Sequence, residues 1–292
     1  MARVSVMQSS EREAGVRGAI AALGHNPVKN KAVLVKPNFN TADPAPGSTH
    51  NDTLAALVDQ LWEMGAASIS LGERSYPPTR RVMEQKGIAP IMEKRQVRVI
   101  DFDDLPADDW VECRPPDSHW KDGFRVARPI LEAECLVSTG CLKTHQFGGV
   151  ITLSLKLHVG VVPTFRNGFP YMQELHSSPY QQEMIAEINT PFSPDLVVMD
   201  GIDTFVDGGP ATGKRVKGNV VMAARDRVAA DAVGVAMLKH LGSNRAIMDA
   251  DIFELRQVKR AAELGIGVRS ATEIDLLPAD DASVELTAAL ED

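Results

Sequence analysis

The sequence predicts an α/β protein with a mostly parallel sheet, or sheets, flanked by helices in three layers. Short runs of aliphatic residues alternate with segments of helical periodicity along the 292 residues, and this alternation is typical of strand-helix-strand units. The strand candidates are apolar along their whole length, as in strands that are covered on both faces. We expect one domain over 1–292, arranged as two α/β lobes at about 1–130 and 131–280 with a cleft between them and a polar C-terminal tail.

The first half of the chain shows this pattern most regularly. Pro37 ends a buried strand, because proline cannot continue the ladder of hydrogen bonds. In the next helix, Asn51 or Asp52 is a suitable N-cap and Gly65 a suitable stop. The elements expected here are helix 11–23, strand 32–35, helix 51–65, strand 67–73, helix 79–94 and strand 97–102.

The pattern is interrupted at 104–123, a segment rich in Pro, Asp and Trp that we interpret as loops or short antiparallel strands. It then resumes, with a strand and a short helix before the buried strand "CLVSTG". The elements expected from there on are strand 135–140, helix 180–192, strand 194–203, strand 220–226, helix 227–240 and an amphipathic helix within 249–267.

Composition and charge exclude several classes of function. The net charge is −8, and no run of Lys and Arg is long enough to follow a phosphate backbone, so we expect no nucleic-acid partner. No uncharged apolar stretch reaches the roughly 18 residues that a membrane span needs. We therefore expect a soluble, cytoplasmic protein that does not bind membranes. Its three cysteines, Cys113, Cys135 and Cys141, match no familiar spacing and are expected to be reduced thiols.

Ligands of open parallel sheets gather where the strands end, at their carboxyl edge. Four loops qualify by this rule, namely 36–40, 143–149, 200–214 and 224–226. In the first, Lys36 and Asn38 flank Pro37 and are suited to orienting an anionic or carbonyl ligand, although ordinary turn chemistry also explains them.

The strongest candidates follow the strand at 135–140. Lys143 and His145 are two residues apart and project the same way if the chain is extended. Gly148 and Gly149 allow a ligand to approach the backbone closely. These residues are expected to bind a ligand or cofactor.

Lys156 and His176 complete this set. Lys156 lies among three leucines, where burial is costly without an anion or a covalent partner, and His176 is expected on a loop before a helix. With His145 they are suited to binding a phosphate or carboxylate, to ligating a metal through the two imidazoles, or to moving protons. The alternatives are solvated histidines and a lysine that reaches out from a helix to solvent.

Two further candidates come after the strand that ends near residue 200. Asp200 is a possible base or metal ligand, or an Asx-turn residue. The loop "DGGPATGK" contains Gly208, Gly209 and Lys214 and has the composition of a phosphate nest, although it lacks the spacing of a Walker motif and also suits a rigid structural loop.

Five segments of the sequence together resemble one family of bacterial and archaeal proteins. They are "VKPNFN", "LVSTGCLKTHQFGGVITLSLKLHVG", "ELHSS", "VVMDGIDTFVDGGPATG" and "ARDRVAADAVG". Their order and spacing are similar to those of domain of unknown function 362. Many members carry an appended module with two iron-sulfur clusters, and the scattered cysteines of this chain predict no intrinsic cluster. Leu157 stands where the family commonly has an asparagine.

The order His145, Lys156, His176 also resembles the catalytic region of the nickel-pincer lactate racemases. There a catalytic histidine precedes a lysine that anchors the cofactor, and a later histidine binds nickel. The resemblance implies a shared location for the site, with a divalent metal or a metal-containing organic cofactor as the group that it would hold.

These observations together predict an enzyme, of oxidoreductase or isomerase type, that acts on a small carboxylate- or phosphate-bearing compound. Lys36, Lys143 and Lys214 would hold the anion, His145 would act as acid or base, and Lys156 with His176 would engage a metal or cofactor. Asp200 is a further catalytic candidate. The alternative is a metal- or ligand-binding protein that partners a separate iron-sulfur redox protein. The aromatic segment 166–173 is a candidate lid or homodimer contact.

Overall fold

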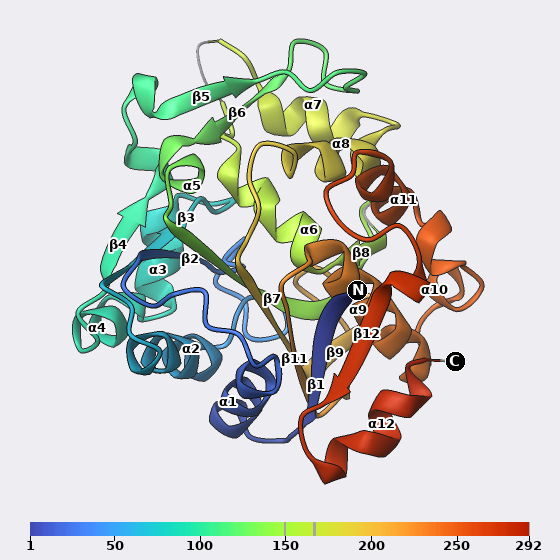
Figure 1. Ribbon diagram of the computed structural model, residues 1–292. Helices are drawn as coiled ribbons and strands as arrows, with labels where there is room; N and C mark the ends of the chain where they lie inside the picture. Colours follow the sequence, from blue (N-terminus) through green and yellow to red (C-terminus); the bar gives the residue numbers. More distant parts are fainter. Residues whose placement is uncertain (149, 166–167, 292) are drawn as a thin grey trace.

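The computed structural model describes residues 1–148, 150–165 and 168–291. Within these residues one sheet of ten strands runs through the molecule, with its main strands in the order β12-β1-β11-β9-β7-β2-β3-β4 (Figure 1). The strands of the first half are β1 (Ala2–Gln8), β2 (Ala32–Lys36), β3 (Ser68–Glu73), β4 (Arg98–Asp101), β5 (Trp110–Cys113), β6 (Phe124–Ala127) and β7 (Cys135–His145). Those of the second half are β8 (Val150–Thr152), β9 (Leu196–Gly208), β10 (Gly213–Lys217), β11 (Val220–Ala224) and β12 (Ile274–Pro278).

Helices connect and cover these strands. The first group comprises α1 (Arg12–Ala22), α2 (Asn51–Glu63), α3 (Thr79–Gln85), α4 (Ile88–Glu93), α5 (Arg128–Leu131) and α6 (Ser154–Leu157). The second comprises α7 (Tyr171–Ser177), α8 (Gln181–Ile188), α9 (Arg227–His240), α10 (Arg245–Met248), α11 (Arg256–Glu263) and α12 (Val284–Ala289). No helix in the described part of the chain is both long and apolar enough to cross a membrane.

The strands β2, β3, β4, β7 and β9 are mutually parallel and form one half of the sheet. In the other half β11 runs antiparallel to both β9 and β1, and β12 is parallel to β1. The hairpin strands β8 and β10 extend the ends of β7 and β9. The sheet is therefore mixed but mostly parallel, and its parallel half brings several strand ends to one edge.

Successive side chains of the strands point to opposite faces, which divides the core into layers. Val33 and Val35 of β2 pack with α1 to α4 on one face, whereas Leu34 packs on the other. In the same way Val198 of β9 contacts the first layer, and Val197 lies in a core with α9 and α11 on the opposite face. This arrangement of helix, sheet and helix confirms the three-layer α/β class.

The segment after β4 builds a small layer of its own. The strands β5 and β6 pair antiparallel, and Trp110 and Trp120 are buried with residues of α7 and α8 in a third apolar cluster. Both strands lie beside α7 at the top of the view in Figure 1. The segment 104–123 thus contributes part of the wall against which α7 packs.

The structure differs from the sequence expectations at four places. The strands β1 and β12 were not expected, and with α12 they occupy the first residues and the polar C-terminal segment. The predicted helix 79–94 is two helices, because Gly87 lies between them with a φ of 64°. The helix expected within 249–267 is limited to α11, which follows a short 3-10 turn. His176 is in α7 and not in a loop.

Candidate functional site

A cavity of about 350 Å³ opens at the carboxyl ends of β2, β3 and β7, the place where the strand-end rule locates ligands. Its walls come from these three strand ends, from β8 and α6, and from α7 opposite. The residues that line it include Asn38, Asn40, Glu73, Arg74, Tyr76, Lys143, His145, Phe147, Thr152, Lys156, His176 and Pro210. Of the predicted site residues, Asn38, Lys143, His145, Lys156 and His176 therefore share one cavity.

Lys143 is a lysine held in place by backbone oxygens. Its side chain is fully buried near the end of β7, and Nζ donates hydrogen bonds to Gly47 O at 2.5 Å and to Pro210 O at 3.1 Å. Burial lowers the pKa of Lys143 to about 8. Two of its three N–H donors are thus occupied, and one is left to face the cavity.

Lys156 is also buried but is held differently. Only 7% of the residue is exposed, and among the described residues no hydrogen bond to its Nζ is found. Burial and, second, the charge of Lys143 lower the pKa of Lys156 to about 8. The two amines therefore form a pair in which one nitrogen is anchored by carbonyls and the other is free within the cavity.

The backbone of the helix that carries Lys156 is held in place by hydrogen bonds with Asp231 and Asn189. The helix α6 has a single turn, and the buried carboxylate of Asp231 in α9 accepts hydrogen bonds from Ser154 N at 2.6 Å and Leu155 N at 3.3 Å. Asn189 Nδ2 donates to Leu155 O at 3.1 Å. Burial raises the pKa of Asp231 to about 7. These contacts satisfy the ends of a turn too short to be stable alone, and so they set the position of the lysine.

His158, two residues after Lys156, belongs to the core. Its ring is completely buried, with Nδ1 at 2.7 Å from Asn189 Oδ1 and Nε2 at 2.8 Å from Ser138 Oγ. Both ring nitrogens have partners, and the residue lies outside the cavity lining. The role of His158 is to connect α6 with β7.

The hydrogen bonds of the two cavity histidines assign them different tautomers. His145 Nδ1 accepts a hydrogen bond from Phe147 N at 3.2 Å, so the neutral ring carries its proton on Nε2. His176 Nδ1 is 2.6 Å from Met172 O, and because a carbonyl only accepts, Nδ1 must donate. The Nε2 of neutral His176 is therefore an acceptor. The two neutral rings therefore offer one hydrogen-bond donor, His145 Nε2–H, and one acceptor, His176 Nε2.

Both histidines are kept neutral by their surroundings. Burial and the charges of Lys156 and Lys143 lower the pKa of His145 to about 2. Burial also lowers the pKa of His176, although a hydrogen bond to Met172 O opposes this effect. At neutral pH the rings do not add to the positive charge of the site, and they are in the form that can exchange protons.

Glu73 and Arg74 are site residues that the sequence expectations missed. They stand where β3 ends, at the edge shared with Lys36. Glu73 Oε1 lies 2.5 Å from Lys36 Nζ, and Glu73 Oε2 accepts from Phe39 N at 2.8 Å. Lys36 itself is absent from the cavity lining, and burial lowers its pKa. A strand was predicted at 67–73, so the strand-end rule, had it been applied to that strand as well, would have found this position.

The cavity wall contains polar groups without partners. Asn38 Nδ2, Arg74 Nε and Thr152 Oγ1 are buried and, within the described residues, make no hydrogen bond. Buried polar groups are normally paired, so these atoms favour a bound ligand or water at this place. The charged lining residues also leave an excess of cations, because Arg74, Lys143 and Lys156 face one carboxylate, Glu73. A negatively charged ligand would balance them.

The glycines shape the rim of the cavity. Gly148 has a φ of 74°, and Gly149 lies outside the described residues, as do residues 166–167 of the expected lid. Gly208 and Gly209 have φ values of 78° and 77°, and a Cβ on Gly209 would lie 2.1 Å from Thr144 O. Gly209 must therefore be a glycine for this loop to place Pro210 against Lys143. Lys214 is exposed on β10 and is not among the lining residues.

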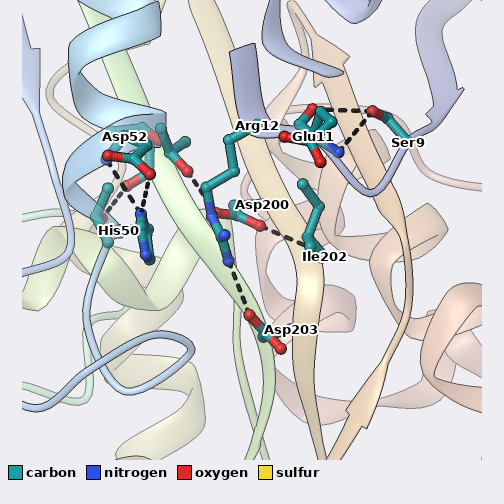
Figure 2. Close-up of polar contacts among 12 residues, drawn as sticks. Ser9, Glu11, Arg12, His50, Asp52, Asp200, Ile202 and Asp203 are labelled. Atoms are coloured by element: carbon teal, nitrogen blue, oxygen red, sulfur yellow. Dashed lines mark hydrogen bonds and ion pairs between the residues drawn. The ribbon is translucent and has the colours of Figure 1, made fainter. Parts of the chain in front are cut away.

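Asp200 lies apart from this cavity, in the middle of β9. Figure 2 shows Arg12 of α1 between Asp200 and Asp203. Arg12 Nε donates to Asp200 Oδ2 at 3.0 Å and Nη2 to Asp203 Oδ2 at 2.9 Å. Thr53 Oγ1 and Ile202 N also donate to Asp200. Its carboxylate is thus engaged in joining α1 and α2 to the sheet.

The described residues contain no group of three or more His, Cys, Asp or Glu side chains suited to holding a metal ion. Among the described lining residues, His145, His176 and Glu73 are of ligand type. Glu73 is paired with Lys36, and one of the two histidines has its Nε2 protonated. A site made of protein ligands alone does not fit a divalent metal here. Ligands from a bound organic molecule would be needed in addition.

The fold and the cavity together define an α/β protein with a cationic pocket at the strand ends. The chain belongs to the family "domain of unknown function" DUF362, whose sequence pattern matches residues 33–236, and this confirms the resemblance seen in its motifs. A thylakoid-associated protein of Synechocystis sp. (strain PCC 6803) is 25% identical over 241 residues, which cover 79% of this chain and 72% of that protein.

Among solved structures, the lactate racemase apoprotein from Thermoanaerobacterium thermosaccharolyticum matches with a TM-score of 0.49 and 15% identity. The match covers 80% of this chain and 57% of the racemase chain, so the present chain spans little more than half the length of that protein.

Proposed function

We propose that this protein is an enzyme that acts on a small carboxylate- or phosphate-bearing organic compound by acid/base chemistry. One observation carries the proposal: an excess of buried cations and unpaired donors faces a cavity that also holds two neutral histidines of opposite tautomer. The cations and the unpaired hydrogen-bond donors would bind an anion. The two histidines would act as a proton donor and a proton acceptor.

The roles of the residues follow from their contacts. Lys143, fixed by Gly47 O and Pro210 O, holds the anionic group together with Asn38 Nδ2. The Nε2 of His176 takes a proton from the carbon next to a carbonyl, and the Nε2–H of His145 donates to the carbonyl oxygen as negative charge develops there. The lysines stabilise that negative charge in a cavity where burial reduces the screening of charges by water.

A bound cofactor would extend this chemistry to electron transfer or to isomerisation. His176 Nε2, which is unprotonated in the neutral ring, is the suitable protein ligand for a metal carried by such a cofactor, and Lys156 is the suitable contact for its organic part. The proton-transfer roles proposed above require the protein side chains alone.

The test combines binding and turnover. Calorimetry with oxalate as the anion probe should show binding by the wild-type protein. The exchange of the C3 hydrogens of pyruvate in D2O, followed by proton NMR, should be faster with the protein than in buffer. We expect His176→Gln and His145→Gln to abolish the exchange and retain oxalate binding, with Lys214→Gln as the matched control.

The possible outcomes separate the candidate functions. Oxalate binding without exchange for pyruvate, glycolate or phosphoenolpyruvate would favour a ligand-binding protein that serves a separate redox partner. An absence of both binding and exchange would contradict the proposal.

A further inference from the structure

The two buried amines of the cavity differ in a way that anion binding alone does not explain. Lys143 Nζ donates to two carbonyls, whereas Lys156 Nζ has no hydrogen-bond partner among the described residues. Hydrogen bonds to two carbonyl groups, as at Lys143, would suit a lysine that only holds an anion in a fixed position. Lys156 instead has its backbone fixed by Asp231 and Asn189 and its nitrogen left free.

We propose that Lys156 is an amine nucleophile that forms an imine with the carbonyl group of a small 2-oxo or aldehydic acid, while Lys143 holds the carboxylate of that acid. The inference rests on the proposed function and narrows its substrate class to acids that carry a carbonyl group. Lysines of this kind are recognised by an apolar environment and a neighbouring cation, and both conditions are present here.

The environment of Lys156 meets these conditions from each side. Leu157, Val159 and Met172 line the same cavity as Lys156 and give it an apolar side. The titratable groups that act on it are Lys143, His145 and His176, and at neutral pH the two histidines are uncharged. The lowered pKa of Lys156 agrees with this geometry, since a larger share of its amine is unprotonated at neutral pH than for an exposed lysine.

The covalent step is balanced without an oxidant or reductant. The lone pair of Lys156 Nζ forms a bond to the carbonyl carbon, and the oxygen is protonated by the Nε2–H of His145. One of the two amine protons then returns to His145, and the other leaves with the hydroxyl group as water, which forms the carbon-nitrogen double bond of the imine. The imine draws electrons from the adjacent carbon, and this assists removal of its proton by His176 Nε2.

The experiment traps the imine by reduction. The intact protein is incubated at neutral pH with glyoxylate and sodium cyanoborohydride, which converts an imine into a stable secondary amine, and the modified lysines are located by peptide mass spectrometry. We expect Lys156 to be labelled at least tenfold faster than the exposed Lys214. Excess oxalate should protect Lys156 and leave the labelling of Lys214 unchanged.

Two variants distinguish this inference from the function on which it rests. Lys156→Arg keeps a positive charge in the cavity and removes the primary amine, so the fast labelling should be lost. Lys143→Met should lose oxalate binding and slow the labelling of Lys156. Equal labelling of Lys156 and Lys214, or fast labelling of another lysine in Lys156→Arg, would overturn the inference even if oxalate binds. Failure of the wild-type protein to bind oxalate would instead contradict the proposed function.

Discussion

Two clusters of charge, each built around a buried carboxylate, are arranged in opposite ways in this protein. The Arg12 cluster comprises Arg12, Asp200, Asp203, Arg215 and Lys217, and its two carboxylates are each contacted by cations or hydrogen-bond donors on several sides. The cavity cluster comprises Arg74, Lys143 and Lys156 around the single lining carboxylate of Glu73. The first is closed and satisfied, and the second is open and carries excess positive charge.

The difference teaches where to look for a ligand. In the Arg12 cluster, although burial raises the pKa of Asp203, hydrogen bonds from Arg215, Lys217 and Arg12 lower it well below its ordinary value, and the charges stabilise one another. In the cavity cluster burial lowers the pKa of both lysines to about 8, and neither lysine forms an ion pair with a carboxylate of the described residues. Buried charges that lack partners at a cavity indicate a binding site.

The largest effect is expected from opening the Arg12 cluster. Asp200→Ala removes a carboxylate bound by Arg12, Thr53 and Ile202 N, and loss of one partner of a buried pair costs about 3 kcal/mol of unfolding free energy. Urea denaturation measures this loss. Oxalate binding by the folded variant should equal that of the wild-type protein. A large loss of affinity without a loss of stability would show that Asp200 acts in the site.

The converse change in the cavity cluster should affect binding more than stability. Lys143→Met removes the anchored cation, and we expect oxalate affinity to fall at least tenfold, equivalent to about 1.4 kcal/mol. The unfolding free energy should change by no more than about 1 kcal/mol, because the charge that is lost was itself costly to bury. Calorimetry and urea denaturation on the same sample test both parts. Unchanged affinity would remove Lys143 from the site.

A smaller effect is expected from pH. Lys143 and Lys156 lose their charge as pH rises through about 8, so oxalate affinity should fall several-fold between pH 7 and pH 9. Stability should change in the other direction. Between about 8 and the ordinary lysine value of 10.5 the unfolded chain binds more protons than the folded one, so the unfolding free energy rises with pH in that window. Calorimetry and urea midpoints across this range test the two signs, and a pH-independent affinity would contradict the assignment of the lysines as the anion site.

The smallest effect is expected at Lys214, which is exposed on β10 outside both clusters. Lys214→Gln should change the unfolding free energy by less than about 0.5 kcal/mol and leave oxalate affinity unchanged. Thermal denaturation and calorimetry measure these two quantities. A tenfold loss of affinity would show that the loop 207–214 reaches the ligand, as its composition suggested.

The sequence predicted those parts of the site that follow directly from strand position. Lys143 and His145 were expected on one side of a strand end, and both line the cavity. Glu73 and Arg74 were missed because an acidic and a basic residue after a strand resemble ordinary surface charge. Asp200 was a catalytic candidate because it stands at the expected end of a strand. Its partner Arg12 is distant in the chain, and no local pattern indicates their contact.

The fold class was predictable because the central strands are buried on both faces and therefore uniformly apolar. The strand β1 was not predictable, because its sequence mixes exposed and buried positions. Its pairing partners, β11 and β12, also lie at the other end of the chain. Long-range pairing of this kind leaves no trace in local periodicity.

The position of β1 has a consequence for how the protein is made. β1 lies between β11 and β12, so its two edges stay unpaired until the segments Val220–Ala224 and Ile274–Pro278 have also been synthesised. Such distant pairing slows folding, and an open strand edge invites association with other chains. Premature termination before Ile274 would leave one edge of β1 permanently uncovered, so truncated products should aggregate even though the cavity residues are all present.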